Sequence, residues 1–404
     1  MCRRGNSEVI DASMDQIASP ADAAIDQPHG MRYGELARIE VLASVSIVVP
    51  TYREVENIPL IVERIARVRN ECLSNLELIF VDDNSADGSV EAVEALGLDW
   101  VRMIVRTDER GLSSAVIHGF RAARGAVLVC MDGDLSHPPE VIPQMILALD
   151  SGQQFVIGSR YVPGGSTDDD WGILRWLNSR VATVLSRPFT SVRDPMSGFF
   201  ALRKTDFDAA ANLDPVGYKI GLELIVKCDF ENVAEIPIRF ADRVHGESKL
   251  SLKEQLQFLR HLRRLYVHAF GNAMHFLQFA AVGASGVVVN FAVLTLLLWM
   301  QLPEAACLAG GIVASLISNF LLNRRITFSY ARHGNIWLQF VGFVGASSLG
   351  MMVNYGVALY LNATWLQGVP YGLYAAALCG ITTGLVFNFL GNRYLVFRTR
   401  YIRR

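Results

Sequence analysis

Two aspartates separated by one glycine, Asp132 and Asp134, are the residues of this chain whose type and spacing best suit chemistry. They directly follow the apolar run 125–131, which is typical of a buried strand. Mg²⁺ and Mn²⁺ prefer oxygen ligands and are commonly held by one or two carboxylates together with the phosphates of a substrate. The pair therefore predicts a divalent-metal site that faces a diphosphate.

Short apolar strands alternate with helix-like segments from Val45 onward, and the spacing of apolar residues predicts a helix over 57–68. The expected strands are 45–49, 76–81, 101–105, 127–131 and 155–158. This alternation favours a doubly wound, mostly parallel α/β sheet, in which ligands bind beyond the carboxyl ends of the strands. Polar clusters follow three of the strands, at 50–54, 82–85 and 132–134. We therefore expect three strand ends to meet at one ligand-binding crevice.

These motifs resemble the inverting glycosyltransferases of family two, which have the GT-A fold. The early segments that carry the resemblance are 50–54, 81–85, 110–112, 132–134 and 158–161. The later segments 194–199, 217–220 and 243–250 are similar to the polyprenyl-phosphate branch, typified by the dolichol-phosphate mannose synthases. The resemblance covers roughly residues 45–265. One departure is Ser136, which stands where the mannose synthases have a metal-contacting Gln.

The resemblance implies a role for each group of residues. Asp132 and Asp134 would hold Mg²⁺ or Mn²⁺ against the departing nucleoside diphosphate. Arg160 and Arg175, with Ser248, would seat the acceptor phosphate, because a planar guanidinium matches phosphate oxygens. Asp134, Arg160 and Arg175 would thus be the catalytic residues. The residues expected to bind the nucleotide-sugar donor are Pro50, Tyr52, Glu54, Val81, Asp83, Arg110, Asp132, Gly133, Asp134, Arg243 and Lys249.

Several other polar residues have a structural interpretation. His137 is expected to be a structural residue, and Asp194 to brace the turn that its Asp-Pro pair indicates. Glu223 is expected to orient Lys219, and the acidic run 168–170 to lie in a solvated loop.

Hydrophobicity divides the chain near Arg264, because the sequence beyond this residue is mostly apolar. Four spans, each near the ~20 residues that cross a bilayer, form an all-α membrane domain. The predicted organisation is a disordered polar tail at 1–43, a GT-A catalytic domain at 44–250, an interfacial amphipathic helix at 251–271 and a membrane domain at 272–404. The expected spans are 276–300, 305–322, 337–361 and 371–390.

The membrane half contains an internal repeat, since 278–290 resembles 339–354 and 319–328 resembles 388–397. Each unit has two spans, so the two repeats are parallel, not inverted. This pattern resembles the GtrA-like membrane domain that is fused to transferases of this branch. Its intramembrane asparagines are expected to bond across helices. They are Asn290, Asn319, Asn354 and Asn388. The competing hypothesis is that the repeats flip a lipid-linked sugar.

Charge and cysteine content place the predicted domains in the cell. Arginines gather before the first span, between the second and third, and after the fourth, so the positive-inside rule predicts cytoplasmic termini and a cytoplasmic catalytic domain. The six cysteines are scattered and indicate neither disulfides nor a zinc site, which fits a reducing compartment. A net charge of −2 gives no reason to expect a nucleic-acid partner.

The predicted function is inverting, metal-dependent transfer of a hexose to a polyprenyl phosphate, dolichyl or undecaprenyl, at the cytoplasmic membrane face. The donor expected first is GDP-mannose, and a UDP-glucose-type donor is the alternative. A carrier of lipid-linked sugars with a degenerate transferase domain is a further alternative. A processive polysaccharide synthase is disfavoured, because Gln257 and Arg260 are followed by His261 where those enzymes have Trp. Oligomerisation through the membrane domain stays open.

Overall fold

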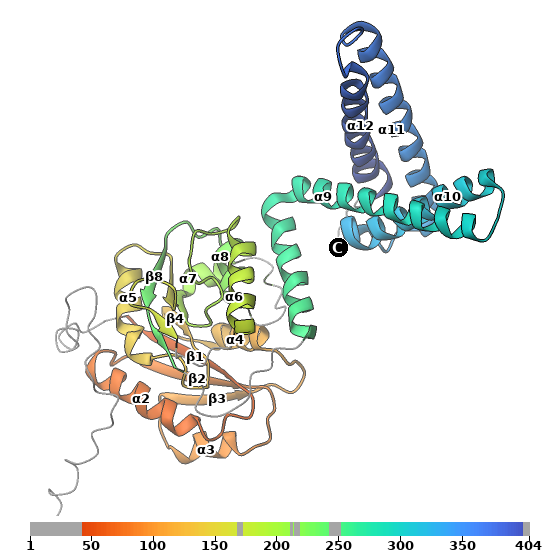
Figure 1. The fold of residues 1–404 in the computed structure, drawn as a ribbon. Coiled ribbons are helices and arrows are strands. Elements are labelled where there is room, and N and C mark those ends of the chain that lie inside the picture. Colours follow the sequence, from red (N-terminus) through yellow and green to blue (C-terminus); the bar gives the residue numbers. More distant parts are fainter. Residues whose placement is uncertain (1–42, 168–172, 211–212, 214–218, 242–251, 399–404) are drawn as a thin grey trace, which may run out of the picture. The chain divides into compact units, whose positions relative to one another are not determined.

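The computed structural model describes residues 43–167, 173–210, 213, 219–241 and 252–398, with side chains described throughout these ranges except at 173–178 and 252–254. The chain divides into two compact units, Met1–Leu265 and Tyr266–Arg404. The first unit contains the sheet, and the second contains the long apolar helices (Figure 1).

A seven-stranded sheet forms the centre of the first unit, in the order β3-β2-β1-β4-β7-β5-β8. All neighbouring strands run parallel except β7, which is antiparallel to both β4 and β5. The strands are β1 (Val45–Thr51), β2 (Leu76–Asp82), β3 (Val101–Val105), β4 (Val127–Cys130), β5 (Phe155–Ser159), β7 (Phe200–Arg203) and β8 (Val233–Pro237). A second, two-stranded parallel sheet pairs β6 (Ser166–Thr167) with β9 (Arg239–Phe240).

Helices cover both faces of the large sheet. Successive residues of a strand point to opposite faces, so the apolar strands contribute side chains to a core on each side. On one face, Ile47 and Val49 share a core with α2 (Ile58–Glu71) and α5 (Ile142–Asp150). On the other face, Val48 packs with residues of α4 (Leu112–Ala122), α7 (Lys204–Ala209) and α8 (Ile220–Lys227). The predicted doubly wound, mostly parallel sheet is confirmed. The remaining helices of this unit are α3 (Ser89–Ala95), a 3₁₀ turn at Pro139–Val141 and α6 (Ile173–Ser186).

Among the residues that the structure describes, four helices are long and apolar enough to cross a membrane, and the second unit consists mainly of them. They are α9 (Leu252–Trp299), α10 (Glu304–Leu322), α11 (Ile336–Thr364) and α12 (Gly372–Gly391). Helix α9 begins in the first unit and is interrupted at Gly271, whose φ of 48° is non-helical. Helices α10 and α12 each continue into a short π-helix, at Asn323–Thr327 and Asn392–Val396. The sequence repeat is thus a structural repeat of two helical hairpins.

Each hairpin is packed by glycines that face asparagines. A Cβ on Gly286 of α9 would lie 2.4 Å from the Asn319 side chain of α10, and one on Gly311 of α10 would lie 2.5 Å from Asn290 of α9. The second hairpin repeats both contacts, through Gly350 with Asn388 and Gly380 with Asn354. Because glycine allows the helix backbones to approach closely, these pairs fix the packing of both hairpins. Phenylalanines from both hairpins share one buried core, in which Phe328 and Phe397 stack at 4.7 Å.

Candidate active site

The carboxyl ends of β1, β2 and β4 lie side by side. Thr51 at the end of β1 is paired in register with Asp82 at the end of β2, and Val48 is paired with Cys130 at the end of β4. The polar segments after these strands therefore come from adjacent positions along one sheet edge, where open α/β sheets bind ligands.

The loops after β1 and β2 are tied to one another through Asp82 and Ser85. The Asp82 carboxylate accepts hydrogen bonds from the Ser85 amide at 2.7 Å and from the Ser85 hydroxyl at 2.5 Å. The Ser85 hydroxyl oxygen in turn accepts the Arg53 amide at 2.8 Å. Arg53 and Asn84 both have positive φ, at 63° and 56°, so both loops turn sharply here. This bonding fixes the loop that presents Tyr52 and Glu54.

Asp83, predicted to bind the donor, is bound to a buried arginine. The Arg106 guanidinium donates to Oδ1 of Asp83 from Nε at 2.9 Å and from a second nitrogen, and its side chain is only 4% exposed. The Asp83 Oδ2 accepts the Gly111 amide at 2.7 Å. Asp83 therefore holds the 106–111 loop in place. That loop carries Arg110, whose guanidinium lies 5.7 Å from the centre of the Tyr52 ring.

Sequence reasoning missed Arg106, although a signal was present. Asp82 pairs with Val105 in the sheet register, so the next residues, Asp83 and Arg106, leave adjacent strand ends together. A charged residue of opposite sign directly after each of two neighbouring strands is the pattern that could have predicted the pair.

The two predicted metal ligands lie on the tight turn after β4. Asp134 is buried, and its carboxylate accepts the hydroxyl of Ser136 at 2.5 Å and the Ser136 amide at 3.1 Å. The Asp132 side chain is 31% exposed, and its amide donates to Nδ1 of His137 at 3.0 Å. Gly133 between them allows the turn to pass close to β1, since a Cβ there would lie 3.3 Å from Val49.

The carboxylate pair fits a metal that is shared with a substrate. Among the residues that the structure describes, no three His, Cys, Asp or Glu side chains gather as a metal cage. Mg²⁺ usually keeps several waters and takes one or two carboxylates plus substrate phosphates, so two carboxylates on one turn match this need.

His137 is packed beside these carboxylates. Its ring is buried, lies 5.2 Å from the Phe199 ring in a stacked arrangement, and accepts a backbone N–H on Nδ1. Burial lowers the pKa of His137, even though the nearby Asp132 and Asp134 favour its charged form. The sequence-based interpretation of His137 as a structural residue agrees with these contacts.

Arg160, predicted to seat the acceptor phosphate, forms a buried ion pair. Its Nε and one terminal nitrogen each donate to the Asp194 carboxylate at 2.8 Å, and its backbone amide donates there at 3.1 Å. Burial alone would lower the pKa of Arg160, but the hydrogen bonds and charge of Asp194 raise it, so the guanidinium stays charged. Glu235 of β8 holds Asp194 in turn by accepting the amides of Arg193 and Asp194 at 2.8 and 3.0 Å. Asp194 thus does more than brace its own turn, because it fixes the direction of Arg160.

The other predicted site residues are placed less directly. Val81 is fully buried in the sheet core, so its side chain packs against the protein. Glu54 accepts the Asn57 amide group at 2.5 Å at the start of α2. Lys227 lies 2.6 Å from the Glu223 carboxylate, whereas Lys219 donates to the Met196 carbonyl at 3.1 Å. Arg243, Ser248, Lys249 and the run 168–170 lie outside the described residues, as does the side chain of Arg175.

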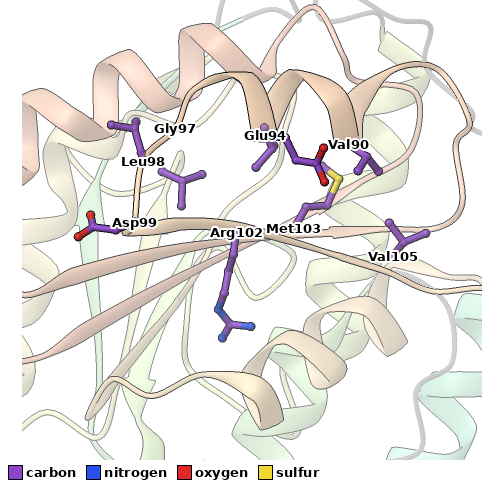
Figure 2. A pocket seen from close by; sticks show the side chains of 10 residues that line it. Val90, Glu94, Gly97, Leu98, Asp99, Arg102, Met103 and Val105 are labelled. Atoms are coloured by element: carbon purple, nitrogen blue, oxygen red, sulfur yellow. The ribbon is translucent and has the colours of Figure 1, made fainter.

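A surface groove of about 430 Å³ lies between α3 and β3 (Figure 2). Val90, Val93, Leu98 and Met103 give it apolar walls, and none of the predicted site residues whose side chains are described lines it.

Comparison with known proteins agrees with both halves of the chain. A model of glycosyl transferase family 2 matches residues 46–210, and a model of the GtrA/DPMS transmembrane domain matches residues 278–397. A dolichol-phosphate mannosyltransferase of Pyrococcus furiosus is 37% identical over 364 residues, which are 88% of this chain and 99% of that protein. Proteins of the same name are 47% identical in Mycosarcoma maydis, over 56% of this chain and 81% of that protein, and 45% identical in Saccharomyces cerevisiae, over 59% and 93%.

The predicted resemblance is therefore confirmed in both halves, and the four apolar helices with the matching transmembrane family make this a membrane protein. The relative from Pyrococcus furiosus extends over nearly the whole chain, so the likeness includes the junction between the two units. The chain belongs to glycosyltransferase family 2, in the branch of the dolichol-phosphate mannosyltransferases, and its second half is a GtrA/DPMS transmembrane domain.

Proposed function

We propose that this protein transfers mannose from GDP-mannose to a polyprenyl phosphate at the cytoplasmic face of a membrane. The observation that carries the proposal is the similarity to dolichol-phosphate mannosyltransferases over 88% of the chain. The geometry supports it, because a carboxylate pair suited to a metal–diphosphate and a fixed arginine lie in one part of the fold. Asp132 also contributes to the electrostatic environment of Arg160.

In the proposed reaction, a phosphate oxygen of the lipid attacks the anomeric carbon of the sugar. The new carbon–oxygen bond forms as the bond to the diphosphate oxygen breaks, and the nucleoside diphosphate leaves with the electron pair. The configuration is inverted, because attack and departure take place on opposite faces. A lipid phosphate is already an anion at neutral pH, so this transfer needs no strong general base.

The residues of the site would divide the work by charge. Asp132 and Asp134 would hold Mg²⁺ or Mn²⁺, which supplies positive charge against the diphosphate when bound. Arg160, directed by Asp194, would bind and orient the acceptor phosphate, and Arg175 and Ser248 would assist. Tyr52 and Arg110 would line the nucleotide pocket, since the loops that carry them are fixed by the Ser85 and Asp83 hydrogen bonds. Arg243 and Lys249 would contact the donor.

The direct test is transfer of label into lipid. Purified full-length protein is incubated with Mg²⁺ or Mn²⁺, a polyprenyl phosphate and labelled GDP-mannose or UDP-glucose in separate reactions. Label that enters the organic phase from GDP-mannose alone supports the proposal. Label from UDP-glucose alone would correct the donor but keep the acceptor class. Label from neither, with folded protein, would refute the proposal.

The proposed orientation has its own test. The connection between α10 and α11 contains Arg324, Arg325 and Arg332, which the positive-inside rule places in the cytoplasm. We replace exposed His333 by cysteine in a variant without the natural cysteines. This cysteine should react with a membrane-impermeant maleimide only after the cells are permeabilised, which gives the reagent access to the cytoplasmic face. Labelling of intact cells that equals the labelling of permeabilised cells would contradict the orientation.

A further inference from the structure

The turn 194–199 enters β7 beside the Asp132 carboxylate. A Cβ built on Gly198 would lie 3.0 Å from Oδ1 of Asp132 and 3.2 Å from Oδ2, both shorter than most contacts that a Cβ makes. The closest atoms at this glycine thus belong to the side chain of a predicted metal ligand.

The backbone on both sides of Gly198 is anchored. The Ser197 hydroxyl donates to the Gly158 carbonyl at 2.7 Å and accepts the Phe199 amide at 3.2 Å. The Phe199 carbonyl accepts the Gly158 amide at 2.9 Å, and the Phe199 ring is fully buried. Because the turn cannot easily retreat, an added methyl group would displace the Asp132 carboxylate.

A second contact fixes the other end of Asp132. Nδ1 of His137 accepts the Asp132 amide at 3.0 Å, and the imidazole is stacked on Phe199, the residue after Gly198. Phe240 meets the same imidazole edge-on at 5.3 Å. The backbone of Asp132 is therefore tied to a packed ring, while its carboxylate lies over a glycine of the neighbouring turn.

We propose that Gly198 and His137 are positioning residues for Asp132, which hold its carboxylate where it can bind a divalent cation. Gly198 does so by leaving room, and His137 does so through its bond to the amide. This inference rests on the proposed role of Asp132 as a metal ligand. Loss of residues that orient metal ligands typically lowers metal affinity by about 10- to 100-fold, so each substitution should cost a loss in that range.

The test measures metal binding directly. Mn²⁺ is titrated into full-length protein with GDP present and followed by electron paramagnetic resonance, for wild type, Gly198→Ala and His137→Phe. The phenylalanine retains a ring for stacking on Phe199 but has no acceptor for the Asp132 amide. Gly221→Ala is the matched control, because its Cβ would meet the Phe200 ring at 3.3 Å and the Ser197 carbonyl at 3.5 Å, with no carboxylate among its nearest atoms.

We expect a Mn²⁺ dissociation constant raised about 10- to 100-fold in both variants and unchanged in Gly221→Ala. Binding of GDP in the presence of EDTA should be unchanged in all four proteins, which a general loss of structure would not allow. If Gly198→Ala fails to fold, His137→Phe decides. A change of twofold or less in either folded variant overturns the inference.

The outcomes also separate this inference from the proposed function. A wild-type protein that binds Mn²⁺ with GDP but transfers no mannose would refute the proposed function, while the positions of Gly198 and His137 would still be tested by the titration. A wild-type protein that binds no Mn²⁺ would refute both.

Discussion

The Arg160–Asp194 pair allows a quantitative prediction. The Asp194 side chain is fully buried and that of Arg160 is 9% exposed, so Asp194→Asn would leave a buried guanidinium without its counter-charge. Removal of one partner of a buried ion pair typically costs about 3–5 kcal/mol. We take the upper part of this range, because Asp194 accepts three hydrogen bonds from Arg160, one of them from the backbone.

The assay is denaturant unfolding of full-length protein in detergent, followed by tryptophan fluorescence, for Asp194→Asn, Arg160→Gln and the double variant. Once both charges are gone, the double variant should be less destabilised than the sum of the two single variants, and this difference is the coupling energy. A control is Arg67→Gln, which removes an exposed ion pair with Glu63 and should cost less than about 1 kcal/mol.

The reasoning would be refuted by a coupling energy near zero together with a small loss of stability in Asp194→Asn. The same variants separate positioning from folding. Without denaturant, and at a temperature where Asp194→Asn is folded, we expect its KM for polyprenyl phosphate to rise while its KM for the nucleotide sugar stays the same.

Three further predictions concern other parts of the chain. Asp83→Asn should release the 106–111 loop, because it weakens charge-assisted hydrogen bonds to Arg106 and the Gly111 amide. We expect a higher KM for the donor and a loss of about 1–3 kcal/mol in the free energy of unfolding. Glu109→Gln, which changes the exposed neighbour of Arg106, is the control for the KM and for the unfolding measurement. Gly350→Ala should lower the thermal unfolding temperature in detergent, because its Cβ would lie 2.1 Å from the Asn388 side chain. Gly345→Ala should leave that temperature unchanged, because its Cβ would have no neighbour within 4 Å. Equal unfolding temperatures for the two variants would argue against the packing role of Gly350. Burial alone would raise the pKa of Glu77, but hydrogen bonds from Ser46 and the Arg124 amide, together with the charge of Arg102, lower that pKa overall. Ionised Glu77 should therefore stabilise the folded protein above about pH 4.3, and this stabilisation should be lost as the pH falls through the folded-state pKa. When the free energy of unfolding is measured against pH, Glu77→Gln should lose less stability in acid than wild type.

Much of the fold could be predicted because it is encoded in local periodicity. The apolar run at 45–49 predicted a strand, and its residues Ile47 and Val48 pack on opposite sides of the sheet. The internal repeat of the membrane half was equally accessible, since it depends on sequence spacing alone.

The pairings within the site were less accessible, because they join residues far apart in the sequence. Arg160 and Asp194 are 34 residues apart, and nothing in either neighbourhood indicates the other. The facing of Gly286 with Asn319 likewise depends on how two helices are set against each other, which the composition of each helix does not determine. Arg106 is intermediate, because a pair of opposite charges after neighbouring strands can be found only once the strand order is known.

The reversed strand β7 has a consequence for how the chain supplies its active site. In a parallel sheet, the segment that precedes a strand lies at the edge opposite to the ligand. Since β7 runs the other way, with Phe200 paired to Cys130 at the end of β4, the segment that precedes it is delivered to the ligand side. One reversal thereby gives the site two kinds of connection, those that leave a strand and one that enters a strand. By this second route Asp194 reaches the Arg160 guanidinium, and Gly198 reaches the Asp132 carboxylate. The spacing of Asp194 and Gly198 from β7 is therefore as constrained as that of Asp132 from β4.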